Sequence, residues 1–455
     1  MLRRMRRYKE EYLALLVLAG PIIVGQVAQV ATGFTDTVMA GRLGPEDLAA
    51  IAVGVNLWIP ILLFCIGIMM AVSSMVSHYY GAGQGEDIKD LMRQALLLAA
   101  ALGLGAMLVV RALAGLLGLL QIDPAVSPIA AEYIRAVSWG MPAVAGYLAL
   151  RFMSEGIGFT RPMMVIQLIG LAFNVVGNYI LMFGKFGVPA MGAVGAGWAT
   201  AIVMWLNLFM LMGYISVHAR FRVIRRYSPG SWEWRRLGEM LRLGIPIALA
   251  LLSEVGMFAG VALLMGRLGV IEVAAHQVAF NFASIMFMIP LGISSATTIR
   301  VGHAMGAGSL ARARFRGTAG ISLAGLCMLG TASVMLVFPQ LIVSIYTDDM
   351  AVRQMAVSLL LMAAVFQLSD GIQVAAAGAL RGLKDTVVPM LAIFVIYWLF
   401  GLPLSYFLGF TRAYGPQGLW FGLIASLTVA AIWLVWRFLR MSRSGATGPA
   451  ALSVD

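Results

Sequence analysis

Twelve long apolar stretches divide this chain, and they constrain its fold more than any other feature. The composition is 61% hydrophobic and 11% charged, whereas a soluble domain is roughly 45–50% apolar and about 25% charged. Each stretch is close to the roughly 20 residues that an α-helix needs to cross a bilayer. We therefore expect an all-α integral membrane protein with twelve transmembrane helices. The expected spans are residues 12–40, 48–77, 91–116, 130–154, 162–184, 191–217, 240–265, 273–301, 317–343, 354–377, 387–410 and 416–440.

The net charge of +12 would suggest nucleic-acid binding in a soluble protein. Here the basic residues lie in loops and at the ends of apolar spans, a pattern that the positive-inside rule explains. Most of the 32 Lys and Arg residues fall on one side if the N-terminus is inside. We therefore expect both termini in the cytoplasm, contact with the lipid bilayer and no nucleic-acid partner. Cys65 and Cys327 lie inside apolar spans and are expected to be unpaired.

The chain repeats itself. Residues 21–83 align without a gap with residues 246–308, and GRLG at 41–44 recurs at 266–269. Six spans per half is an even number, so the two halves are expected to point the same way, as parallel repeats do in secondary transporters. The predicted domains are an N-lobe at 1–217, a cytoplasmic linker at 218–237, a C-lobe at 238–441 and a cytoplasmic tail at 442–455.

Three acidic residues lie deep in apolar spans: Asp36, Glu254 and Asp370. An ionisable group at that depth costs roughly 2.5–3.5 kcal/mol on insertion scales and indicates a functional site. We expect no Lys or Arg equally deep to pair with them. The acids therefore predict a cation or proton site, and the alternative is a protonated acid that donates a hydrogen bond to a backbone carbonyl.

Amide, hydroxyl and aromatic side chains accompany these acids. Amide and hydroxyl oxygens beside a carboxylate suit a small cation, although interhelical packing is the alternative for any single Asn or Gln. The candidates are Gln29 in the first span, Asn174 and Asn178 in the fifth, Thr200 in the sixth, Phe258 in the seventh, Gln277 and Asn281 in the eighth, and Gln367 and Gln373 in the tenth. The sequence has no His or Cys set at metal-ligand spacing and no phosphate-binding loop. It therefore predicts neither an enzyme nor a cofactor.

Several segments resemble the multidrug and toxic compound extrusion (MATE) family, in its bacterial NorM branch. They are TDTVMAGRLG (35–44), FNVVGNY (173–179), GAVGAGWAT (192–200), SEVGMFAG (253–260), AAHQVAFNFAS (274–284) and LSDGIQVAAAGALRGLKDT (368–386). The resemblance implies two six-helix lobes around a central cavity in the bacterial inner membrane. It also implies export of cationic amphipathic drugs by antiport with Na⁺ or H⁺, and we expect a monomer.

The resemblance also assigns residues. It implies a C-lobe cation site of Glu254, Asp370 and Gln277 with Phe258 nearby. The implied N-lobe site consists of Asp36, Asn174, Asn178 and Thr200. We expect the drug to contact Glu254, Phe258, Asp370, Asn281, Gln367 and Gln29. Phe366 stands where some relatives have a Tyr, which removes one oxygen ligand from a C-lobe Na⁺ site.

Other functions stay open at this stage. A flippase of lipid-linked precursors from the same superfamily would need deep basic residues for a pyrophosphate. An integral-membrane enzyme would need closely paired acids, usually with His or Cys. A channel would be distinguished by its coupling stoichiometry. The sequence does not decide between Na⁺ and H⁺ as the coupling ion.

Overall fold

The computed structural model describes residues 2–120, 122–221 and 233–443, and within these ranges it is all helix with no strand. The first half contains α1 (Leu2–Gly41), α2 (Pro45–Gly81), α3 (Gly85–Leu116), η1 (Leu117–Leu120), α4 (Ser127–Ser138), α5 (Met141–Gly156), α6 (Arg161–Phe183), α7 (Ala193–Val217) and η2 (Ala219–Phe221). The second half contains α9 (Trp234–Gly266), α10 (Val270–Gly306), α11 (Leu310–Val337), α12 (Pro339–Ser344), α13 (Met350–Gly382), α14 (Val387–Phe394), η3 (Val395–Gly401), α15 (Leu402–Tyr406), η4 (Phe407–Thr411) and α16 (Gly415–Met441). Cys65 and Cys327 are unpaired, as expected.

Within the described ranges, 11 helices are long and apolar enough to cross a membrane. The expected span at 130–154 is not one continuous helix, which corrects the prediction. It consists of α4 and α5, separated by a turn at Trp139 and Gly140. Pro142 at the start of α5 has no N–H to continue the hydrogen-bond ladder, so the chain kinks there. The last apolar stretches agree with the predicted spans, and the one at 387–410 contains two π-helical turns, η3 and η4.

The chain divides into two compact units, and neither is a continuous piece of sequence. The N-terminal unit contains residues 24–80 and 84–248, and the C-terminal unit contains residues up to 23, residues 81–83 and residues from 249 onward. The predicted linker at 218–237 is described only outside 222–232, and the predicted tail at 442–455 lies outside the described residues from 444 onward. The predicted lobes therefore stay a prediction.

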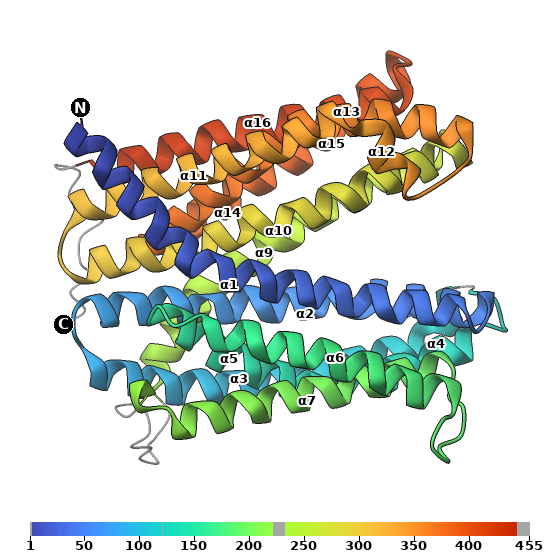
Figure 1. Ribbon diagram of the computed structural model, residues 1–455, viewed down its shortest axis with the longest axis horizontal. Helices are drawn as coiled ribbons and strands as arrows, with labels where there is room; N and C mark the ends of the chain where they lie inside the picture. Colours follow the sequence, from blue (N-terminus) through green and yellow to red (C-terminus); the bar gives the residue numbers. More distant parts are fainter. Residues whose placement is uncertain (1, 121, 222–232, 444–455) are drawn as a thin grey trace. The chain divides into compact units, whose positions relative to one another are not determined.

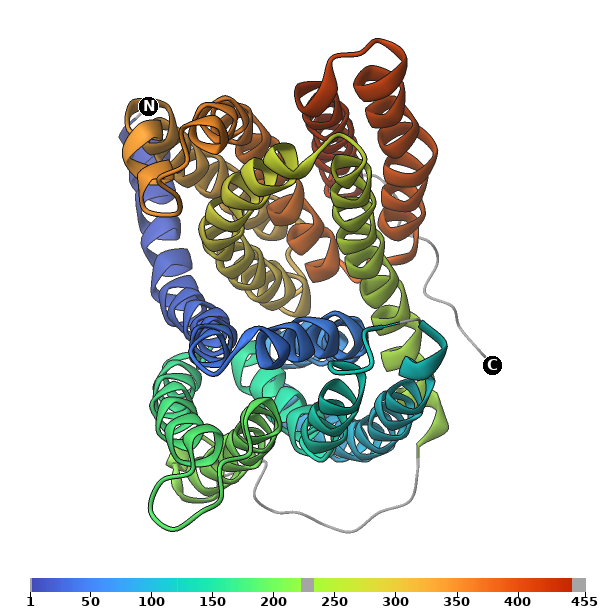
Figure 2. The ribbon, with the colours of Figure 1, turned by 90° about the vertical axis from the view of Figure 1, so that its right-hand side faces the viewer.

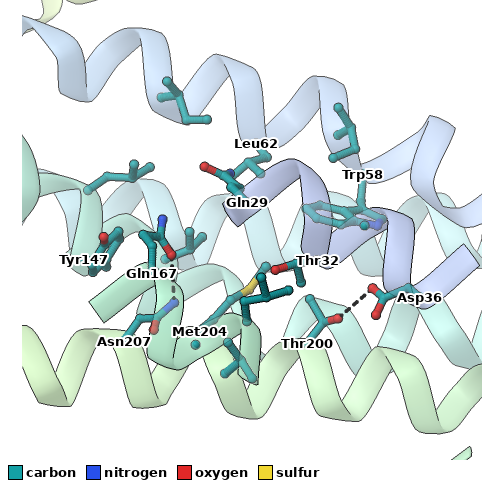
Figure 3. Close-up of a pocket in the computed structure, with 18 of the residues that line it drawn as sticks. Gln29, Thr32, Asp36, Trp58, Leu62, Tyr147, Gln167, Thr200, Met204 and Asn207 are labelled. Carbon is teal, nitrogen blue, oxygen red and sulfur yellow. Dashed lines mark hydrogen bonds between the residues drawn. The ribbon is translucent and has the colours of Figure 1, made fainter. Parts of the chain in front are cut away.

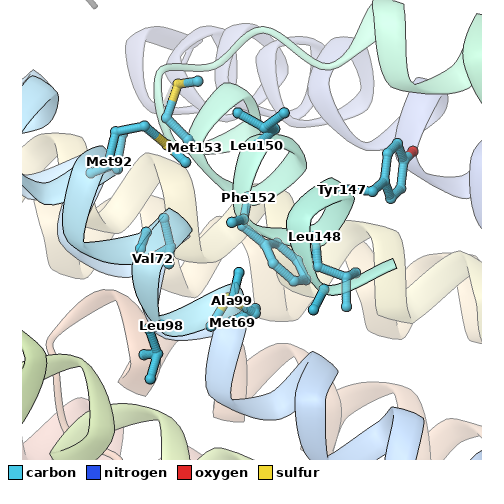
Figure 4. Close-up of a cluster of buried hydrophobic side chains, with 14 of the residues drawn as sticks. Met69, Val72, Met92, Leu98, Ala99, Tyr147, Leu148, Leu150, Phe152 and Met153 are labelled. Atoms are coloured by element: carbon cyan, nitrogen blue, oxygen red, sulfur yellow. The ribbon is translucent and has the colours of Figure 1, made fainter. Parts of the chain in front are cut away.

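In the N-terminal unit, α3 packs on α5 and α6 packs on α7 (Figure 2). Apolar side chains from α2, α3 and α5 form its largest core, with Met69, Met92, Leu98, Phe152 and Met153 among them (Figure 4). Sulfur-containing and aromatic side chains fill irregular gaps between helices, which suits a core of this kind.

In the C-terminal unit, α10 packs on α11 and α13, and α13 packs on α16 (Figure 1). Hydroxyl groups of α10 donate across to backbone carbonyls of α13. Ser294 Oγ lies 2.6 Å from the Val374 oxygen, and Thr298 Oγ1 lies 2.8 Å from the Gly378 oxygen. Small residues let the two backbones approach closely, as is common between transmembrane helices.

Two ion pairs secure the ends of helices that are divided between the two units. Residues 2–23 of α1 belong to the C-terminal unit, where Glu11 accepts from Arg300 on α10 at 2.7 and 2.6 Å. Residues 234–248 of α9 belong to the N-terminal unit, where Arg236 donates to Asp87 on α3 at 2.9 Å. Glu11 and Arg236 occupy equivalent positions of the repeat, 225 residues apart. Equivalent segments of α1 and α9 are therefore each held by an ion pair. The residue on α1 is acidic, and the equivalent residue on α9 is basic.

Candidate functional site

Asp36 lies in a polar cluster of the N-terminal unit that joins α1, α6 and α7. The carboxylate is 6% exposed. Asn178 Nδ2 donates to Asp36 Oδ1 at 2.6 Å, and Thr200 Oγ1 donates to Oδ2 at 3.2 Å. Asn178 Nδ2 also lies 3.2 Å from Asn174 Oδ1. The structure thus brings together all four residues assigned to the N-lobe site.

This cluster opens on a cavity of about 170 Å³ within the same unit. Asp36 and Thr200 lie at one end, Thr32 and Met204 line the middle, and Gln29 also faces the cavity (Figure 3). Among the described residues, Asn178 Oδ1 has no hydrogen-bond partner. The cluster therefore offers carboxylate, amide and hydroxyl oxygens, which are the ligands that hard cations prefer.

The other two acids lie together in the C-terminal unit. Glu254 on α9 is 8% exposed and Asp370 on α13 is 4% exposed, and the two interact electrostatically. Gln373 hydrogen-bonds to Glu254, and the Tyr397 hydroxyl donates to Gln373 Oε1 at 2.6 Å. Asp370 Oδ1 has no partner within the described ranges. One carboxylate oxygen is thus left for a proton or a cation.

Arg381 corrects the expectation that no basic residue pairs with the deep acids. This side chain is buried near the end of α13 and interacts electrostatically with Glu254. It also donates to Ser294 Oγ at 2.8 Å. The prediction missed the pair because the expected span ended at 377, whereas α13 continues to Gly382. Arg381 was therefore placed at the inner membrane surface.

An aromatic cluster lies close to these acids in sequence. Phe258, one turn after Glu254, lies 5.4 Å from Phe280 and 5.7 Å from Phe366 between ring centroids. Phe366 also meets Trp420 at 5.8 Å. Phe366, where the resemblance led us to expect a tyrosine in some relatives, thus packs among aromatic rings. It supplies no oxygen to the acids.

The remaining predicted residues have varied surroundings. Gln367 is buried and donates from Nε2 to the Ala283 oxygen at 3.1 Å, while its Oε1 accepts from Thr331 at 3.1 Å. Asn281 is exposed and accepts from Tyr346 at 3.3 Å. Gln277 is exposed and lines a shallow depression near Gly266. Their assignment to ion or drug binding stays a prediction.

A second buried charge pair lies in α5, where the sequence had indicated an inner span end. Arg151 Nε donates to Glu155 Oε1 at 2.7 Å, and both side chains are buried. Arg151 and Tyr147 line the same cavity as Asp36. Arg151 and Glu155 are four residues apart, which puts both side chains on one helix face. This spacing in the sequence could have indicated the ion pair.

Within the described residues, no group of three or more His, Cys, Asp or Glu could hold a metal ion.

A profile of the MatE family matches residues 21–180 and again residues 246–407. This chain belongs to the MatE family. The two matches start at the two repeat positions identified in the sequence, so the resemblance and the internal repeat are both confirmed. Three of the six motifs that carried the resemblance contain a deep acid: Asp36, Glu254 or Asp370.

Three relatives match nearly the full chain. "Multidrug resistance protein MdtK" of Edwardsiella ictaluri is 40% identical and covers 96% of this chain and 97% of its own length. "Multidrug resistance protein PmpM" of Pseudomonas aeruginosa is 41% identical, with 97% and 94% covered. "Probable multidrug resistance protein NorM" of Xanthomonas campestris is 42% identical, with 98% and 97% covered.

Solved structures share the fold of this MatE-family chain. The eukaryotic MATE transporter AtDTX14 superimposes with a TM-score of 0.87 at 21% identity, covering 96% of this chain and 98% of its own. An outward-facing multidrug resistance MATE transporter of the MOP superfamily gives 0.86 at 21% identity, with 95% and 96% covered. These matches confirm the predicted all-α transporter fold with two repeats.

Proposed function

We propose that this MatE-family chain exports cationic amphipathic drugs from the cytoplasm in exchange for Na⁺ or H⁺. Relatives that are about 40% identical over nearly the whole chain are named multidrug resistance proteins. The observation that carries the proposal is Asp36. It is a buried carboxylate whose hydrogen-bond partners Asn178 and Thr200 are neutral, and it lies in the wall of a cavity.

Exchange follows from competition for the carboxylate. A cationic drug and a coupling ion both stabilise a buried negative charge, so binding of one weakens binding of the other. Alternating access converts this competition into antiport if each ligand favours a different conformation by its differential affinity. H⁺ would need only the Asp36 carboxylate. Na⁺ would also use Asn174 Oδ1, Asn178 Oδ1 and Thr200 Oγ1, all of which belong to the same cluster.

Glu254 and Asp370 form the second proposed coupling site. Two adjacent carboxylates repel each other, so a proton or a cation between them is favourable. Arg381 already neutralises part of this charge, and Phe366 supplies no oxygen. Both features favour H⁺ over Na⁺ at this site. We therefore propose proton coupling in the C-terminal unit, with Phe258 one turn from Glu254.

The test is ethidium efflux from proteoliposomes with an imposed Na⁺ gradient or, separately, an imposed pH gradient. At least one of the two gradients should accelerate ethidium efflux above the rate in protein-free liposomes. Acceleration by the pH gradient alone would assign H⁺ to both sites, and acceleration by Na⁺ alone would contradict proton coupling at Glu254 and Asp370. No response to either gradient would overturn the antiporter proposal.

The alternatives are less well supported by the described residues. A flippase for a pyrophosphate lipid needs unpaired basic groups, whereas Arg151 is paired with Glu155 and Arg381 interacts with Glu254. Family membership favours a transporter over an enzyme. We further propose that the protein works as a monomer in the bacterial inner membrane with both termini in the cytoplasm, and without a bound cofactor.

A further inference from the structure

The break between α4 and α5 holds a cation at its surface. Arg111 on α3 donates from Nε to Ser138 Oγ at 3.0 Å, and its Cζ lies 4.2 Å from the centroid of the Trp139 ring. Ser138 is the last residue of α4, and Trp139 is the next residue. An arginine from a neighbouring helix therefore lies over the aromatic ring at the break.

This arginine has no acidic partner. In the part of the chain that the structure describes, its polar and ring contacts are Ser138 and Trp139, and no carboxylate pairs with it. A guanidinium has five N–H donors, and Ser138 uses the one on Nε. Because α3 is long and apolar enough to cross a membrane, a cation within it is costly unless a polar or anionic group satisfies it. The remaining N–H groups therefore indicate an acceptor from outside the protein.

Trp139 is the centre of an exposed aromatic surface. Its side chain is 47% exposed, and Trp205 and Phe209 on α7 are exposed as well. Trp205 Nε1 donates to the Trp139 backbone oxygen at 3.0 Å, and the Trp205 ring stacks on Phe209 with 5.5 Å between centroids. Tryptophan rings are enriched where the hydrocarbon of a bilayer meets the headgroups. We therefore expect this surface to face lipid.

Exposed apolar side chains continue from this surface along α3 and α7. Leu108 and Leu104 precede Arg111 by three and seven residues, so all three lie on one face of α3. Met212 follows Trp205 by seven residues and lies on the same face of α7. With the N-terminus in the cytoplasm, α3 runs outward and α7 runs inward. The apolar residues therefore lie on the inner side of Arg111 and Trp205, and the cation lies at their outer end.

α4 adds a second basic residue to this surface. Arg135 is exposed and precedes Trp139 by four residues, which places both on one helix face. Its backbone oxygen accepts from Ser138 Oγ at 2.6 Å. Glu132 is also exposed on this face, but it lies three residues farther from Trp139 than Arg135 does. The part of the surface next to Trp139 therefore carries two arginines.

We propose that Arg111 and Trp139 form a binding site for an anionic phospholipid of the outer leaflet. The lipid phosphate accepts hydrogen bonds from the Arg111 guanidinium, as phosphates commonly do from arginine. The acyl chains lie along the exposed apolar residues of α3 and α7. Phosphatidylglycerol fits better than a zwitterionic lipid, whose headgroup would bring an ammonium close to Arg111 and Arg135. This site does not depend on the proposed transport activity.

The test measures lipid binding to the purified full-length protein by native mass spectrometry. Dioleoyl phosphatidylglycerol is compared with zwitterionic dioleoyl phosphatidylethanolamine. Arg111→Gln removes the charge from the site. Arg42→Gln is the matched control, because it removes one positive charge from an exposed turn of the same unit. Ser138→Ala removes the hydrogen bond within the protein and leaves the guanidinium in place.

Wild type should bind phosphatidylglycerol at its tightest site about tenfold more tightly than phosphatidylethanolamine. Arg111→Gln should abolish this preference, whereas Arg42→Gln and Ser138→Ala should keep it. Arg111→Lys should lose part of it, because an ammonium lacks the planar fork and stacks less well on Trp139. Trp139→Leu is a second variant that keeps the arginine, and it should also reduce the preference. Equal binding of the two lipids by wild type, or an unchanged preference in Arg111→Gln or in Trp139→Leu, would overturn the site.

A soluble competitor separates a lipid from a free phosphate diester. Glycerophosphoglycerol has the headgroup of phosphatidylglycerol without acyl chains. It should not displace the lipid even at about 100-fold excess, because each buried CH₂ of an acyl chain contributes to affinity. Displacement by this competitor would overturn the lipid proposal and assign the site to a soluble anion.

Discussion

At the residue scale, the account depends on whether Asp36 carries the coupling ion. Asp36→Asn keeps the shape of the side chain and the contact with Asn178 but removes the negative charge. We expect gradient-driven ethidium efflux to fall to the rate of protein-free liposomes, with Tm unchanged within about 2 °C. The control Asp348→Asn alters an exposed loop carboxyl and should transport normally. Normal transport by Asp36→Asn would exclude this residue as a coupling site.

A substitution at Gln367 tests whether this side chain has a packing role or a drug-binding role. Its amide connects the Ala283 oxygen and the Thr331 hydroxyl, so Gln367→Leu removes two buried hydrogen bonds between helices, while Thr331 keeps its contact with the Met328 oxygen. The loss should lower the free energy of unfolding by about 1–3 kcal/mol, measured as a fall in Tm in detergent. Ethidium affinity should stay within twofold of wild type. Weaker ethidium binding with unchanged Tm would instead support the predicted drug contact.

The sequence could predict which residues meet around Asp36, but it predicted only part of the surroundings of Glu254. Asp36, Asn174, Asn178 and Thr200 are matched by family motifs, and they meet in the structure. The partner of Glu254 was missed because a helix extends beyond its apolar stretch. Hydropathy marks where lipid ends, and it does not mark where a buried helix end continues into the protein.

At the element scale, close helix packing is concentrated at particular glycines. A Cβ at Gly382 would lie 2.7 Å from Val301 Cβ and 2.9 Å from the Thr298 backbone oxygen. Gly156 meets Val76 and Ser73 in the same way in the N-terminal unit. Val76 and Val301 are 225 residues apart, so the repeat preserves this helix crossing.

Gly382→Ala should therefore lower stability, because the backbone of the neighbouring helix must shift. We expect a loss of about 1–3 kcal/mol, measured as a lower Tm. Gly330→Ala on α11 is the matched control, since a Cβ there meets nothing within 4 Å. That control should be neutral or slightly stabilising because Ala favours helix. Equal effects of the two substitutions would contradict the packing argument.

The first segment of α1 is held by a partly buried ion pair between Glu11 and Arg300, which the sequence did not indicate. Glu11→Gln leaves Arg300 without its bidentate partner and should cost about 2 kcal/mol or more. Glu10→Gln is the control, because Glu10 and its partner Arg6 are exposed and such pairs contribute at most about 1 kcal/mol. Similar Tm values for both variants would show that the Glu11 contact contributes little.

The length of the apolar stretches predicted the positions of the long helices well. It did not predict where a helix is interrupted within a span. The spans of α2, α7 and α16 were predicted closely because lipid requires long apolar runs. The interruption at Trp139 and Gly140 lies inside an apolar run, so hydropathy does not detect it. Gly140 and Pro142 were the local signals, but Gly and Pro also occur inside the continuous helix α1.

At the scale of the whole molecule, the two proposed coupling sites fall in different halves of the repeat, although their acids are not at aligned positions. Each half contains a buried acid on its first helix, Asp36 in one and Glu254 in the other. Their partners differ: neutral amide and hydroxyl groups in one unit, a second acid and Arg381 in the other. We infer that the duplicated fold was retained while the two sites diverged chemically.

The central claim is that drug movement and cation movement are obligatorily exchanged. The most direct measurement imposes an ethidium gradient across proteoliposomes that start with equal pH and equal Na⁺ on both sides. The account predicts that ethidium flow drives H⁺ or ²²Na⁺ in the opposite direction, and that Asp36→Asn abolishes this counterflow. Ethidium that runs down its gradient through the wild-type protein without any cation movement would contradict antiport.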